Sequence, residues 1–120
     1  MRPERLYLQD MVEAAGNIAY HIEDRSRGQF EGDRTVKAAV LHELTGIGEA
    51  AGRLTEEFRN RHPEVPWAKI VAFRNLVVHE YFGLVWSIVR NTATTLVPGL
   101  RTQLAGVLTA EFPEEPGSKL

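Results

Sequence analysis

The stretch Val36–Phe58, VKAAVLHELTGIGEAAGRLTEEF, decides the fold. Its apolar residues recur every three or four positions, at Val36, Val40, Leu44, Ile47, Ala51, Leu54 and Phe58. This spacing places them on one stripe of an α-helix, because a helix turns once in about 3.6 residues. Asp33 suits the N-cap before this helix, and Pro63 comes shortly after its end. The stretch therefore predicts a long amphipathic helix that needs partner helices to cover its stripe.

The sequence on either side is also helical in its pattern. A first helix is predicted over about residues 4–25, a third over 67–81, and a fourth from about Leu84 onward. Pro98 cannot continue a straight helical hydrogen-bond ladder, so a kink or restart is expected at 95–99. No alternation typical of strands is present in the sequence. The prediction is an all-α, antiparallel four-helix bundle with a kinked or split last helix.

Length and composition indicate one small domain. The chain has 120 residues and no cysteine, and we expect a helical domain over 1–112 followed by a flexible tail over 113–120. Neither a signal peptide nor an apolar run of about 18–20 residues is visible, which predicts a cytoplasmic protein without membrane association. The net charge of −2 argues against broad electrostatic binding of nucleic acid. An RNA site would have to be locally basic.

Two short patterns resemble known motifs without fulfilling them. Gly46, Gly48 and Gly52 lie inside the long helical stripe with no strand before them, which favours close helix–helix approach over a nucleotide-binding loop. His-Glu pairs occur at His42 and His79, but neither continues to the H-E-x-x-H pattern of zinc enzymes. We therefore predict no metal and no cofactor, although a metal site assembled from distant helices stays open.

The third helix, WAKIVAFRNLVVHEY over 67–81, carries polar residues in an unusual setting. It is apolar around most of its circumference, which predicts the most buried helix of the bundle, yet Arg74 lies on its apolar side. A narrow strip of small and polar residues occupies another face, namely Ala68, Ala72, Asn75 and His79. This strip and the face formed by Gly48 and Gly52 both invite another helix to come close, and together they predict a homodimer.

Two interpretations of these polar residues remain open at this stage. In the structural one, Arg74 extends its charged end to solvent, and Asn75 supports His79 as a satisfied core histidine. In the functional one, the residues form a site, since each is costly to desolvate without a partner. Arg74 and His79 project about 140° apart on a regular helix. Either the helix ends or bends near His79, or a second subunit completes the site.

The segment Arg74–Tyr81, RNLVVHEY, resembles a known family. It matches R-x-x-x-x-H-x-Y, the signature of HepT-like toxins of the HEPN superfamily, and Asn75 is the polar residue usual after the arginine. The segments 47–50 and 63–67 and the residue Phe82 are also similar to this family, so that the resemblance covers about residues 5–108. Gly83 and its neighbours depart from it, because relatives often carry Asp there.

The resemblance implies a dimeric, metal-independent endoribonuclease that acts as the toxin of a toxin–antitoxin system. It also implies a cognate minimal nucleotidyltransferase antitoxin, which in some systems attaches AMP to the motif tyrosine, here Tyr81. We assign proton transfer to His79, phosphate stabilisation to Arg74 and orientation of His79 to Asn75. The alternative is a non-catalytic helical module that binds a nucleotidyltransferase partner or a nucleotide.

Overall fold

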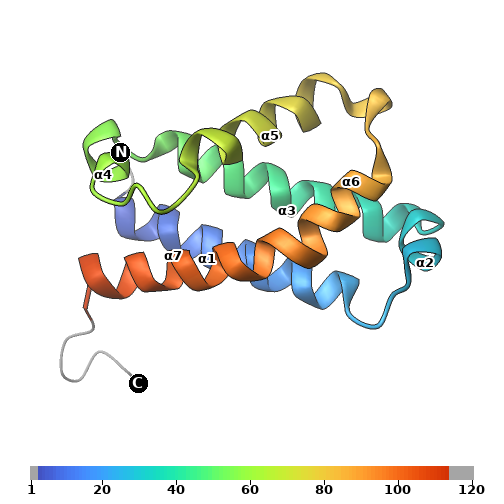
Figure 1. Ribbon diagram of the computed structural model, residues 1–120, viewed down its shortest axis with the longest axis horizontal. Helices are drawn as coiled ribbons and strands as arrows, with labels where there is room; N and C mark the ends of the chain where they lie inside the picture. The colour runs from blue at the N-terminus through green and yellow to red at the C-terminus, as the bar shows by residue number, and fades with distance from the viewer. Residues whose placement is uncertain (1–2, 114–120) are drawn as a thin grey trace.

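The computed structural model describes residues 3–113, which form an antiparallel bundle of helices (Figure 1). The helices are α1 (Glu4–Ile22), α2 (Arg27–Glu31), α3 (Arg34–Arg53), α4 (Glu56–Asn60), α5 (Trp67–His79), α6 (Trp86–Asn91) and α7 (Val97–Glu111). A 3₁₀ turn, η1 (Tyr81–Gly83), follows α5, and a π-helical segment, η2 (Thr92–Leu96), joins α6 to α7. No strand occurs in these described residues, and the predicted all-α class is confirmed.

The core lies where α1 packs against both α3 and α7. α3 is shared, because it packs against α1 on one side and α5 on the other. All seven residues of the predicted apolar stripe are buried, and fully buried side chains from other elements include Phe30, Leu8, Met11, Ile18 and Leu104. The spacing in the sequence therefore identified correctly the helix around which the bundle is built.

The predicted long second helix is interrupted near its end. α3 stops at Arg53, and Thr55 starts α4 as an N-cap whose hydroxyl accepts the N–H of Phe58 at 3.1 Å. The Glu4 carboxylate of α1 accepts the N–H and the hydroxyl of Thr55, at 3.1 and 3.0 Å. Apolar spacing continues through this break, since Leu54 and Phe58 are both buried. Periodicity alone therefore did not reveal the turn.

A short helix, α2, was not predicted. Ser26 and Gln29 form a capping box, in which each side chain bonds the backbone N–H of the other residue. Phe30 is fully buried and fixes the helix to the core. The first helix accordingly ends at Ile22, a few residues before its predicted end.

The predicted kink in the last helix exists, but its centre lies earlier in the chain. Pro98 is the second residue of α7, and its missing N–H leaves a gap in a helical hydrogen-bond ladder that continues from α6 through η2. The distortion is the π-helical segment 92–96. The hydroxyls of Thr92 and Thr94 donate at 2.9 Å to carbonyls four residues earlier, an interaction that bends helices.

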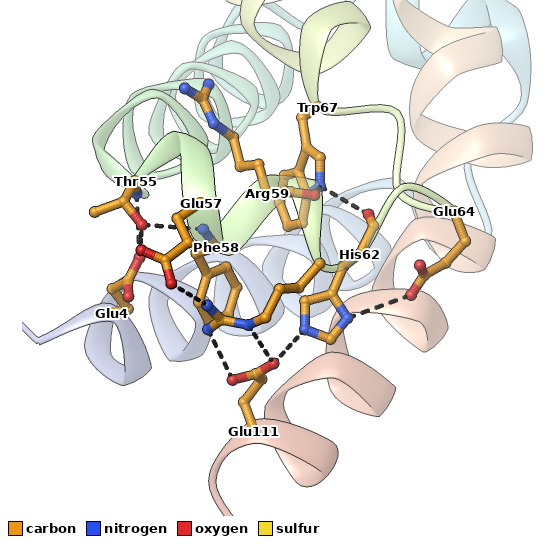
Figure 2. A network of polar contacts seen from close by, with 10 residues as sticks. Glu4, Thr55, Glu57, Phe58, Arg59, His62, Glu64, Trp67 and Glu111 are labelled. Carbon is orange, nitrogen blue, oxygen red and sulfur yellow. Dashed lines mark hydrogen bonds and ion pairs between the residues drawn. The ribbon is translucent and has the colours of Figure 1, made fainter.

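The loop between α4 and α5 is held firmly to the end of α7 (Figure 2). The indole N–H of Trp67 donates to the carbonyls of Arg59 and His62 at 3.1 and 2.9 Å. Glu111 of α7 accepts from Arg61 at 3.0 Å and contacts the His62 ring at 2.6 Å. The start of α5 is thereby fixed to two other parts of the bundle.

The predicted tail, 113–120, lies outside the described residues except for Pro113. Within residues 3–113, no helix combines the length and the apolar character needed to cross a membrane.

Candidate functional site

α5 is not the most buried helix, and that prediction is wrong for the single chain. Of its residues only Trp67 and Val77 are buried. The strip of small and polar residues, which we call the α5-strip, is exposed throughout and consists of Ala68, Ala72, Asn75 and His79. The apolar residues Leu76 and Val78 also reach solvent, at 46% and 45% exposure. The prediction failed because α5 packs chiefly against α3 and is left uncovered on its other sides.

The position of Arg74 depends on a glycine of α3. A Cβ atom added at Gly48 would overlap the Cβ of Arg74 and lie 2.7 Å from its Cγ. One turn further along, Gly52 faces Val71 of α5 at 4.0 Å. The predicted close approach is confirmed at Gly48, but the partner is α5 of the same chain. The space next to Gly48 is therefore filled by α5 rather than by a second copy.

The guanidinium of Arg74 extends from this crossing to the surface. Its Nη2 forms an ion pair with a carboxylate oxygen of Glu49, which follows Gly48 on α3. Its Nη1 donates to the amide oxygen of exposed Asn75 at 2.9 Å. Within residues 3–113 its Nε is buried and has no hydrogen-bond partner. Arg74 is thus held at two nitrogens, while its side chain keeps 27% exposure.

Glu49 was not among the predicted site residues. The sequence carried a usable signal, because Glu49 directly follows the glycine that permits the close helix approach. A carboxylate at the rim of such a crossing is well placed to meet a cation on the other helix.

The hydrogen-bond partner of Asn75 differs from the predicted one. Its amide oxygen accepts a hydrogen bond from Arg74, and in the described chain no hydrogen bond joins it to His79. The expected orientation of His79 by Asn75 is therefore not what the structure shows. The geometry instead connects Asn75 to the guanidinium.

His79 is the last residue of α5 and is exposed. The helix ends at this residue, which is one of the two alternatives that the sequence left open. Even so, Arg74 and His79 form no hydrogen bond with each other within residues 3–113. No direct bond therefore fixes the imidazole relative to the guanidinium within one chain.

Tyr81 lies in the turn η1, beyond the end of α5. Its side chain is 48% exposed, and its ring meets the fully exposed ring of Phe82 edge to face at 5.4 Å. A shallow depression between α3 and α5 lies beside it, lined by Ala38, Leu41, His42, Thr45, Val77, Val78 and Tyr81. The tyrosine is therefore accessible, next to a small surface hollow.

A second group of charged residues lies at the opposite end of α5. Hydrogen bonds from Arg61 and His62 lower the pKa of Glu111 below its ordinary value, and the same carboxylate raises the pKa of Arg61. The Glu111 carboxylate accepts from Arg61 at 3.0 Å and lies beside the His62 ring (Figure 2). Across residues 3–113, no three side chains of the His, Cys, Asp or Glu type are grouped closely enough to hold a metal ion.

Comparison with known proteins supports the motif-based interpretation. A protein of Caldanaerobacter subterraneus subsp. tengcongensis named "Putative RNase TTE0752" is 32% identical over 111 residues, which are 92% of this chain and 99% of the relative. One of Methanocaldococcus jannaschii named "Putative RNase MJ1380" is 33% identical over 93 residues, covering 74% of this chain and 85% of the relative. One of Thermococcus cleftensis named "Probable ribonuclease HepT" is 30% identical over 100 residues, covering 83% and 91%.

No solved structure gives a significant match to the chain. Residues 8–107, which include both Glu49 and the segment 74–81, match the family described as "Ribonuclease HepT-like". Because this match spans well over half of the sequence, the chain belongs to the ribonuclease HepT-like family.

Proposed function

We propose that this protein is a metal-independent endoribonuclease with Arg74 and His79 as its catalytic residues. The observation that carries the proposal is a surface guanidinium, held at Asn75, on the same helix that ends in an exposed imidazole. An arginine can bind a phosphate through paired N–H donors, and an imidazole can move a proton near neutral pH.

The chemistry uses the 2′-hydroxyl of RNA as the nucleophile. His79 takes the 2′-OH proton, the 2′-oxygen bonds to the adjacent phosphorus, and the bond from phosphorus to the 5′-oxygen breaks. The departing 5′-oxygen takes a proton from water, which leaves a 2′,3′-cyclic phosphate, and Arg74 stabilises the charge that develops on the phosphoryl oxygens. A DNA strand lacks the 2′-OH and should not be cleaved.

Cleavage of a single-stranded oligoribonucleotide by the purified protein in EDTA tests this proposal. We expect wild type to cleave, and His79→Ala and Arg74→Ala to lose about 100-fold or more of the rate, as expected when a proton-transfer or charge-stabilising group is removed. His21→Ala, on α1, is the matched control and should retain the activity. Activity that disappears in EDTA and returns with Mn²⁺ would contradict a metal-independent mechanism.

The site also requires a second copy of the chain. On a regular helix Arg74 and His79 project about 140° apart, no hydrogen bond joins them within residues 3–113, and the α5-strip is exposed beside apolar Leu76. A two-fold axis at this strip would bring two copies of the same patch together, so that one subunit could complete the site of the other. We therefore place the homodimer interface on the α5-strip.

Sedimentation at micromolar concentration tests the dimer. Ala72→Glu puts bulk and charge into the middle of the α5-strip and should yield monomers. Ala19→Glu, at an exposed position of α1, is the control and should leave the dimer intact. A dimer that survives Ala72→Glu would place the interface elsewhere.

We further propose that the protein is the toxin of a pair whose antitoxin is a minimal nucleotidyltransferase that adenylylates Tyr81. The exposed hydroxyl-bearing ring and the neighbouring hollow support this assignment. An added AMP brings phosphate charge near Arg74 and competes with RNA for the guanidinium. Incubation with ATP and the cognate enzyme should add adenylyl mass to wild type but not to Tyr81→Phe. Equal neutralisation of both proteins without mass gain would show that the partner inhibits by docking alone.

A non-catalytic interaction module is the second candidate. The exposed apolar residues that follow the motif, Phe82, Val85 and Ile88, favour it, because they form a surface suited to a protein partner. Expression of the chain with and without the neighbouring nucleotidyltransferase distinguishes the two. Growth arrest that needs His79 and is relieved by the partner supports the toxin, whereas partner binding without growth arrest supports the module.

A further inference from the structure

Glu49 is the charged residue in closest contact with the proposed site, and the mechanism above gives it no role. Its carboxylate, 42% exposed, forms an ion pair with Nη2 of Arg74, and it belongs to α3 rather than to the motif helix. Most surface ion pairs contribute little to the free energy of unfolding, so stability does not explain why Glu49 pairs with Arg74.

We propose that Glu49 is the positioning residue for Arg74, which fixes the plane of the guanidinium so that its remaining N–H groups face the RNA phosphate. The inference rests on the proposed ribonuclease function and extends it from the motif helix to α3. In this arrangement Gly48 and Glu49 act on different parts of Arg74. Gly48 leaves room for the aliphatic part of the side chain, and Glu49 holds the guanidinium.

The geometry supports the two-part arrangement. The stem of Arg74 lies against the backbone of α3, because a Cβ at Gly48 would overlap it. Beyond that point an arginine still has several rotatable bonds, whose freedom is costly to lose at the moment of reaction. Glu49 and Asn75 hold Nη2 and Nη1 respectively, so the orientation of the planar group is already set. Each of these two nitrogens carries a second N–H for a phosphate oxygen.

The charges explain why the effect should appear in the rate rather than in binding. Glu49 places a negative charge next to the cation that meets the phosphate, which weakens attraction for the RNA backbone. Its removal therefore leaves a more positive site that binds RNA at least as well. The same change lets the guanidinium rotate, and a misplacement of about 1 Å is worth roughly 100-fold in rate.

Steady-state cleavage of one oligoribonucleotide gives the first test. We expect Glu49→Gln to lower kcat by about 10- to 100-fold without raising KM, and Glu49→Asp to recover part of the loss. Glu43→Gln is the matched control, since Glu43 also lies on α3 but accepts from Asn17 at 3.0 Å, away from Arg74. The proposal is overturned if Glu49→Gln keeps its kcat, or if it loses affinity with kcat unchanged.

The second test does not depend on cleavage. In wild type the Nε–H of Arg74 is buried, so its NMR signal should exchange slowly with water and vanish in Arg74→Lys. We expect Glu49→Gln to accelerate that exchange at least tenfold and Glu43→Gln to leave it unchanged. Unaltered exchange in Glu49→Gln would overturn the positioning role. If wild type cleaves no RNA, the proposed function fails, and this measurement alone decides whether Glu49 fixes Arg74.

Discussion

The two ends of α5 differ in how far their side chains are buried and hydrogen-bonded. At its start, Trp67 is 7% exposed, and its indole N–H donates to the carbonyls of Arg59 in α4 and His62 in the following loop. At its end, His79 and Tyr81 are exposed and Phe82 is fully so. The first end uses burial and satisfied polar groups to fix the helix, and the second leaves groups suited to chemistry accessible. A helix anchored at one end can present the other without a large cost in stability.

The anchored end also contains charge pairing between separate elements. Arg61 and His62, which follow α4, both contact Glu111 near the end of α7, and Figure 2 shows the His62 ring beside this carboxylate. Lys37 of α3, by contrast, lies over an aromatic ring, 4.7 Å from the centre of Trp86, which packs on Phe30. Variants at the two ends should therefore separate stability from activity.

The largest expected effect on stability is that of Trp67→Ala. Removal of a buried indole costs about 3–5 kcal/mol through lost burial and the cavity that remains. Thermal unfolding followed by circular dichroism measures this, with Tyr20→Ala as the control, because Tyr20 is 75% exposed. A loss as small as that of the control would show that the start of α5 is not anchored by the indole.

A smaller effect is expected at the crossing of α3 and α5. Gly48→Ala forces the two helices apart, because the new methyl group would overlap the near end of the Arg74 side chain, and overpacking costs about 1–3 kcal/mol. Gly46→Ala is the matched control on the same helix, where an added Cβ meets nothing within 4 Å. That change should stabilise the protein by about 0.5–1 kcal/mol. Equal effects of the two substitutions would contradict the close crossing.

Most of the bundle could be predicted from the sequence, because apolar residues that recur every three or four positions mark the buried face of a helix. The seven apolar residues of the stripe from Val36 to Phe58 are all buried, and at Gly48 the predicted close packing of two helices is found. Periodicity could not reveal the break at Leu54 and Thr55, because the apolar spacing continues across it. It also missed α2, whose signal is the capping box at Ser26 rather than a repeat.

The candidate site was predictable in its residues but not in its contacts. The motif identifies Arg74, His79 and Tyr81, yet the α5-strip was assigned to a buried helix and is exposed. The apolar residues around a helix indicate that its surface has to be covered. They do not indicate whether the same chain or a second copy covers it. Glu49 was missed for a related reason, since its pairing with Arg74 depends on how two separate helices cross.

A weaker, pH-dependent effect is expected from Glu111→Gln. Hydrogen bonds from Arg61 and then His62 lower the pKa of this carboxyl below its ordinary value of 4.5. The ionised form therefore adds stability that is fully present above about pH 4.5 and is lost as the pH falls through the lowered value. The pair lies near the surface, so we expect a loss below that of Gly48→Ala. Denaturant titrations at several pH values should show the gap to wild type closing in acid; a constant gap would contradict the assignment.

The smallest expected effect on stability is at the exposed end, in His79→Ala and Tyr81→Phe. Within residues 3–113 neither side chain is buried and neither makes a hydrogen bond that the substitution would remove. Exposed substitutions of this kind change the free energy of unfolding by about 0.5 kcal/mol or less. Each change is made in the Ala72→Glu monomer, and the free energy of unfolding is measured there. This separates the effect within one chain from any contribution of the dimer interface. A cost above about 1 kcal/mol, of the size seen when a buried interaction is lost, would mean that the exposed end also supports the fold. A negligible cost of His79→Ala together with its lost cleavage would show that the chain keeps this imidazole accessible for chemistry, at the end of a helix whose position is secured elsewhere.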